Sequence, residues 1–75
     1  MKPGKWAVYT GYDLHYYNGR TLKNGHLLQV REKMGWPGDF YRCHSDTLAG
    51  IDPLLHADAL REISEDEVDL YKMAQ

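Results

Sequence analysis

Residues 26–33 read His26-Leu27-Leu28-Gln29-Val30-Arg31-Glu32-Lys33. In an extended chain successive side chains point to opposite faces, so Leu28 and Val30 share one face of this segment. Leu27, Gln29 and Arg31 share the other face, which is mostly polar. Such alternation is typical of a strand that has one face in a core and the other toward water. The segment therefore predicts a β-strand at the centre of a mainly β fold.

The same alternation recurs on both sides of this segment. Residues 5–10 are rich in aromatic and β-branched side chains and predict one strand. Residues 39–44 predict another strand, with Tyr41 and Cys43 together on one face. We expect the apolar faces of these strands to share one core.

Two turn signals interrupt the chain between the first two predicted strands. Asn18-Gly19 and Asn24-Gly25 are dipeptides that favour tight turns, because both residue types tolerate a positive φ. Residues 12–25 therefore predict a long irregular hairpin with its tip near Asn18-Gly19.

A helix start is visible near the C-terminus. Ser64-Glu65-Asp66-Glu67 is a capping box, in which a serine hydroxyl and a glutamate carboxylate each accept a hydrogen bond from the other residue's backbone amide. It predicts a short helix at 65–73, with Val68, Tyr71 and Met73 on the inward face.

Residues 53–61 fit two different structures. Asp52-Pro53 has the residue types of a helix cap and a first helical position, and the leucines and alanines that follow favour a helix. A single 3₁₀ turn before a last strand at 60–63 fits the preceding strand pattern better. Both alternatives stay open at this point.

Length and composition indicate one small globular domain over residues 1–75. The chain is 43% hydrophobic and 27% charged, with a net charge of −2. Cys43 is the only cysteine, so no internal disulfide can form and a reducing compartment is expected. No stretch approaches the roughly 20 apolar residues of a membrane span. We expect a cytoplasmic protein without a membrane partner.

The order of these signals resembles an SH3 domain over residues 6–63. Residues 22–30 look like the diverging turn and second strand of that family, and residues 36–43 look like its n-Src loop and third strand. Gly50-Ile51-Asp52-Pro53 is similar to the run before its closing 3₁₀ turn. The resemblance implies an SH3-like five-stranded half-open barrel at 5–63, of the bacterial type, followed by the short helix.

The resemblance also implies a binding surface. Ala7-Val8-Tyr9 followed by Tyr12 is similar to the family's Ala-Leu-Tyr-Asp-Tyr, so the implied groove residues are Tyr9, Tyr12, Phe40 and Pro53. Trp36 is a further candidate binding residue that does not depend on the resemblance, because a tryptophan in a turn is a frequent interface contact. Tyr12 stands one residue late and Phe40 lacks an indole donor, which disfavours a basic proline-rich ligand.

These aromatic residues favour a non-enzymatic module that binds a protein or peptide. No nucleophile motif or phosphate loop is present in the sequence. The four histidines and Cys43 lack the close spacing of a zinc site, so neither a metal nor a cofactor is expected. An oligomeric enzyme with its site between subunits is one alternative, because such a site leaves no motif in a single chain.

Nucleic-acid binding is the other alternative. Residues 1–38 carry six basic against two acidic groups, whereas residues 39–75 carry three against nine. Aromatic rings beside basic groups can stack bases and hold phosphates. The residues that carry this alternative are Tyr16, Tyr17, Arg20, Lys23, Arg31 and Lys33.

Overall fold

The structure is a computed structural model that describes residues 1–35 and 38–73. These residues form a mainly β domain with one antiparallel five-stranded sheet in the order β6-β5-β4-β1-β7, a small β2–β3 hairpin and a C-terminal helix. The elements are β1 (Trp6–Tyr9), β2 (Leu14–His15), β3 (Thr21–Leu22), β4 (Leu27–Lys33), β5 (Phe40–His44), η1 (Asp46–Leu48), β6 (Leu54–His56), η2 (Ala57–Ala59), β7 (Leu60–Ile63) and α1 (Glu65–Met73).

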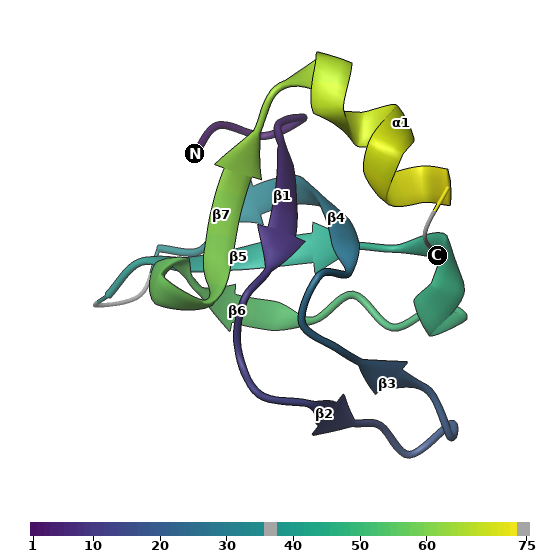
Figure 1. Cartoon of the computed structure of the whole chain (residues 1–75). Coiled ribbons are helices and arrows are strands. Elements are labelled where there is room, and N and C mark those ends of the chain that lie inside the picture. Colours follow the sequence, from purple (N-terminus) through teal and green to yellow (C-terminus); the bar gives the residue numbers. More distant parts are fainter. Residues whose placement is uncertain (36–37, 74–75) are drawn as a thin grey trace.

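The sheet is curled, because its two edge strands are joined by a very short link. β6 and β7 lie at opposite ends of the strand order, yet only the 3₁₀ turn η2 separates them in sequence. Five flat strands would hold these edges about 19 Å apart. A 3₁₀ turn from His56 to Leu60 spans only about 8 Å. The sheet must therefore bend, and in Figure 1 β1 and β7 run across the direction of β5 and β6.

The inner face of the curl holds the main core. Val30 of β4 pairs with Cys43 of β5, and both side chains are fully buried. All the main strands contribute, and the buried members are Ala7, Tyr9, Leu22, Leu28, Val30, Tyr41, Cys43, Leu48, Leu55 and Leu60. Burying one such aliphatic side chain is worth roughly 1.5–3 kcal/mol. The alternation expected for 26–33 and 39–44 is confirmed.

The outer face carries a second apolar cluster beneath α1. Val8, Leu27, Ile63 and Val68 are buried together there. Ile63 precedes the helix and Val68 lies in its first turns, so the two form the hydrophobic staple that fixes the helix on the sheet. The helix spans the residues expected from the capping box. In the described chain, no helix is long and apolar enough to cross a membrane.

One inward residue of the helix was predicted wrongly. Val68 is buried and Tyr71 is partly buried, but 86% of Met73 is exposed. Tyr71 lies three residues after Val68 and so stays on the same helix face, whereas Met73 lies five residues after it. That offset turns Met73 about 140° away from the sheet.

The structure decides between the two alternatives for residues 53–61 and shows the hairpin predicted for residues 12–25. Residues 53–61 contain β6, the 3₁₀ turn η2 and the start of β7, so the 3₁₀ alternative is confirmed. β2 pairs with β3, and the turn between them is closed by a hydrogen bond of 3.0 Å from the Gly19 amide to the Tyr16 carbonyl. The predicted hairpin and its tip are therefore confirmed. In Figure 1 the hairpin lies at the end of the domain opposite to α1.

The hairpin is attached to the core through Tyr9. The Tyr9 ring is buried, and its hydroxyl donates a hydrogen bond to the carbonyl of Tyr12 at the start of the hairpin. Gly11 lies against this ring, and a Cβ placed there would come within 2.5 Å of Tyr9 Oη. The close approach requires a residue without a side chain at position 11.

Gly11→Ala is therefore expected to lower the free energy of unfolding by about 1–3 kcal/mol, because the buried Tyr9 ring has to shift. Gly35→Ala is the matched control, since none of the described residues other than its chain neighbours comes within 4 Å of a Cβ at Gly35. Urea unfolding followed by circular dichroism measures both variants. Equal effects of the two substitutions would contradict the packing described for Tyr9.

Candidate binding cleft

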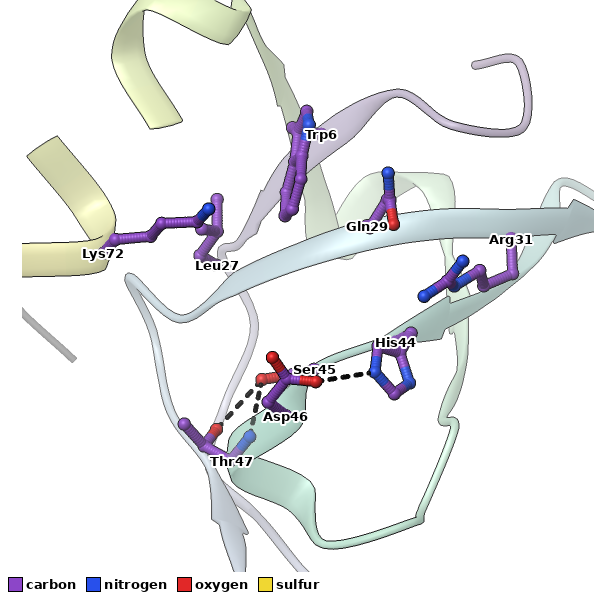
Figure 2. Close-up of a pocket in the computed structure, with 9 residues that line it drawn as sticks. All are labelled: Trp6, Leu27, Gln29, Arg31, His44, Ser45, Asp46, Thr47 and Lys72. Atoms are coloured by element: carbon purple, nitrogen blue, oxygen red, sulfur yellow. Dashed lines mark hydrogen bonds and ion pairs between the residues drawn. The ribbon is translucent and has the colours of Figure 1, made fainter. Parts of the chain in front are cut away.

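A half-open cleft of about 440 Å³ lies on the outer face of the sheet, beside α1. Its size falls within the range of known ligand sites, roughly 300–1,000 Å³. Figure 2 shows Trp6 and Gln29 on one side, the segment from His44 to Thr47 on the other, and Lys72 extending from α1. The lining residues are Trp6, Leu27, Gln29, Arg31, His44, Ser45, Asp46, Thr47 and Lys72.

Strand register places the central lining residues in one row. Trp6 of β1 is the cross-strand partner of Gln29, and Gln29 of β4 is the partner of His44 of β5. Directly paired residues of an antiparallel sheet project to the same face and lie side by side. An aromatic, an amide and an imidazole side chain therefore run across three strands. The register of β4 shifts between Val30 and Glu32, at Arg31.

One end of the cleft is apolar. The Trp6 ring is partly buried and Leu27 is buried, both as members of the cluster beneath α1. The Lys72 ammonium lies 5.3 Å from the centre of the Trp6 ring, a cation–π distance. The helix thus presents a positive charge next to the aromatic wall.

The hydroxyl groups of Ser45 and Thr47 line the opposite wall, where both lie within hydrogen-bonding distance of His26 Nε2. Ser45 caps the 3₁₀ turn η1 and accepts a hydrogen bond of 3.3 Å from the Thr47 amide. Its Oγ lies 3.1 Å from His26 Nε2 and 2.9 Å from Thr47 Oγ1. Burial lowers the pKa of His26, so its ring is neutral near pH 7. Among the described residues no carboxylate contacts His26. The pair formed by Ser45 and His26 therefore lacks the acidic residue that orients the histidine in a catalytic triad.

A chain of charged groups continues from the cleft along the outer face. His44 Nδ1 lies 2.8 Å from Asp52, and His44 Nε2 lies 3.0 Å from Asp46. Asp52 also accepts a hydrogen bond of 2.9 Å from Arg42, which lies 3.5 Å from Glu32. The hydrogen bonds to Asp52 and Asp46 raise the pKa of His44, against the opposing effects of desolvation and of the Arg31 charge.

Two cations of the cleft lack an acidic partner within the described part of the chain. The Arg31 side chain is exposed and makes no ion pair there, and its electrostatic neighbour is His44. Lys72 contacts the Trp6 ring rather than a carboxylate. Asp46, the acidic residue in the lining, contacts His44 Nε2 at 3.0 Å.

Comparisons of the chain with protein-family models, with curated proteins and with solved structures gave no match.

Of the residues expected to form an aromatic groove, the four that the structure describes do not line this cleft. Tyr9 and Pro53 are buried, and Phe40 is partly buried. The Phe40 ring lies edge-on to the His56 ring, with the two ring centres 5.1 Å apart. Tyr12 is 94% exposed. Trp36 lies outside the described residues.

The residues of the nucleic-acid alternative occupy several elements. Tyr16 packs partly against the core, Tyr17 is exposed, and Arg20 and Lys23 are exposed on either side of β3. Lys33 lies 3.9 Å from Asp39. Of this set, Arg31 lines the cleft.

Sequence reasoning missed four of the lining residues that matter most: Trp6, Gln29, His44 and Lys72. The alternation in 26–33 already placed Gln29 and Arg31 on the outer face. The register that brings Trp6 and His44 to Gln29 is not readable from one sequence.

Cys43 is a free cysteine whose side chain is buried in the main core. Burial, and secondarily the Asp52 charge, raises the pKa of the Cys43 thiol to about 11, so it stays protonated at neutral pH. A protonated buried thiol is a poor nucleophile. Within residues 1–35 and 38–73, histidine, cysteine and acidic side chains form no group of three placed to hold a metal ion.

The two histidines beside the cleft are expected to titrate on opposite sides of the ordinary pKa of about 6.5. His44 should titrate above it because Asp52 and Asp46 stabilise the imidazolium, and His26 below it because it is desolvated. Protonation of His44 therefore stabilises the fold fully below about pH 6.5, and this stabilisation is lost as pH rises through the folded-state pKa. Proton NMR of the imidazole rings measures both values.

Asp52→Asn tests whether the Asp52 carboxylate causes the raised pKa of His44. It should lower the pKa of His44 and leave that of His26 unchanged, because His26 does not contact Asp52. A His44 pKa at or below the ordinary value in the unsubstituted protein would contradict the described ion pairs.

Proposed function

We propose that the chain is a small protein- or peptide-binding module built on an SH3-like half-open barrel. The curled five-stranded sheet supports the barrel, as does the 3₁₀ turn between the last two strands. The irregular hairpin between β1 and β4 supports it further, because the resemblance places a long loop there.

The observation that carries the binding function is the row Trp6-Gln29-His44 in an open cleft. Recognition of a peptide needs apolar contact area together with polar groups that fix orientation. Trp6 and Leu27 supply the apolar contact area. Gln29 supplies a polar group that can fix orientation: its Nε2 makes one long hydrogen bond of 3.4 Å to the Gly4 carbonyl, and its side-chain oxygen accepts no hydrogen bond from the described residues.

A protein ligand fits this cleft better than a nucleic acid does. Two cations line the cleft, whereas binding of a phosphate backbone depends on neutralising many phosphates. The whole chain carries a net charge of −2, which disfavours a polyanion.

Selection from a displayed peptide library against the purified chain tests the proposal. Calorimetry then measures the affinity of a recovered peptide for the unsubstituted protein and for Trp6→Leu, a change that keeps an apolar side chain over Leu27. We expect Trp6→Leu to weaken binding about tenfold or more, as at an aromatic hot spot. Tyr12→Ala is the control, because Tyr12 is exposed and does not line the cleft.

Amide chemical shifts of the labelled protein locate the bound peptide. Shifts concentrated at Gln29, His44 and Thr47 would support the proposal. Shifts confined to the β2–β3 hairpin, or a larger loss of affinity in Tyr12→Ala than in Trp6→Leu, would place binding elsewhere. Failure to recover any peptide that binds would overturn the module itself.

A further inference from the structure

We infer that the segment bound in the cleft is an acidic peptide, with one carboxylate paired to Arg31, another paired to Lys72 and an apolar side chain against Trp6 and Leu27. This inference rests on the proposed function and names its ligand class. It follows from three observations: the two cations without acidic partners among the described residues, the pairing of the nearby acids with Arg42 and His44, and the apolar wall between the two cations in Figure 2.

The cations face the cleft from two different elements. Arg31 lies at the register shift of β4, and Lys72 lies in the last turn of α1. Within the described chain neither has an acidic partner, although the protein carries eleven acidic residues. A guanidinium pairs with a carboxylate through two parallel hydrogen bonds, and an ammonium adds a point charge. A ligand carboxylate would supply the missing counter-charge.

The acids near the cleft already have partners within the protein. Asp46 lies 3.0 Å from His44 Nε2, and this contact is one cause of the raised pKa of that imidazole. Asp52 is shared between His44 at 2.8 Å and Arg42 at 2.9 Å. A basic ligand would have to compete with these pairs, whereas an acidic ligand meets two cations that have no competitor among the described groups.

The apolar wall of Trp6 and Leu27 lies beside Lys72. It therefore determines which kind of side chain the ligand carries next to its acidic residue. Lys72 lies over the Trp6 ring, and Leu27 is buried beside them in the cluster beneath α1. A carboxylate that pairs with Lys72 therefore brings neighbouring ligand atoms onto an aromatic and an aliphatic surface. An acidic residue next to a large apolar residue fits this arrangement. A free inorganic anion would leave the wall uncovered.

The acidic start of α1 argues against a longer polyanion. Glu65, Asp66 and Asp69 are exposed on the same helix that supplies Lys72. A nucleic-acid strand that extended beyond the cleft along α1 would meet these carboxylates. A short peptide with two acids would not need to reach them.

The test uses the full chain and three synthetic peptides of about eight residues, each with a central leucine next to a tryptophan. The flanking positions carry aspartate and glutamate in one peptide, asparagine and glutamine in the second, and lysine in the third. We expect calorimetry to give about tenfold tighter binding of the acidic peptide than of the neutral one, with little binding of the basic one. The preference should shrink when ionic strength rises from about 0.05 to 0.3 M.

Charge reversal identifies the cations. Arg31→Glu and Lys72→Glu should each weaken binding of the acidic peptide about tenfold, and the double variant should prefer the basic peptide. Lys33→Glu is the matched control, because Lys33 is exposed on the same strand as Arg31 but does not line the cleft. Thermal unfolding of each variant shows whether the fold is kept.

The outcomes separate this inference from the proposed function. Equal affinity for the acidic and basic peptides, with shifts at Gln29 and His44, would overturn the acidic ligand and leave the binding module standing. An equal loss in Lys33→Glu and Arg31→Glu would also overturn it. Binding of none of these peptides, and of none from the library, would overturn both. Tighter binding of a single-stranded oligonucleotide at the same residues would replace the peptide with a nucleic acid.

Discussion

The short link between the two edge strands is the constraint on which the rest of this structure depends. Residues 57–59 join β6 to β7, although four strand spacings separate these strands in the sheet. The sheet can satisfy this connection only by curling. Curling gives the sheet an inner face, whose side chains pack against one another, and an outer face that another element has to cover. The inner face becomes the main core, and α1 covers only part of the outer one.

The candidate cleft is the uncovered remainder of that outer face. Trp6 and Leu27 belong at once to the cluster beneath α1 and to the cleft wall, so the packing of the helix and the shape of the cleft are set by the same side chains. The ion pairs of His44 fix the opposite side. Because Asp46 and Asp52 are paired with His44, the lining cations Arg31 and Lys72 are left without an acidic partner among the described residues, although the chain as a whole is negative.

Much of the fold was predictable from the sequence, because periodicity is a local signal. The alternation in 26–33, the turn at Asn18-Gly19 and the capping box at Ser64 each act within a few residues, and the structure has a strand, a turn and a helix there. The cleft was not predictable, because it depends on register between strands. Gln29 is adjacent to Trp6 and His44 only through pairings that join residues more than ten positions apart. Burial was not predictable at Tyr9 either: this aromatic residue, expected in a surface groove, packs in the core.

The curl itself is tested most directly by nuclear Overhauser contacts between side chains in the free protein. A curled sheet predicts contacts across the interior that connect the ring of Tyr41 and the methyl groups of Leu55 with the side chains of Ala7 and Leu60 through the buried cluster. In a flat sheet of the same strand order β6 and β1 would be about 14 Å apart, beyond the reach of such contacts. A spectrum that contains the neighbouring-strand contacts but none across the interior would contradict the account.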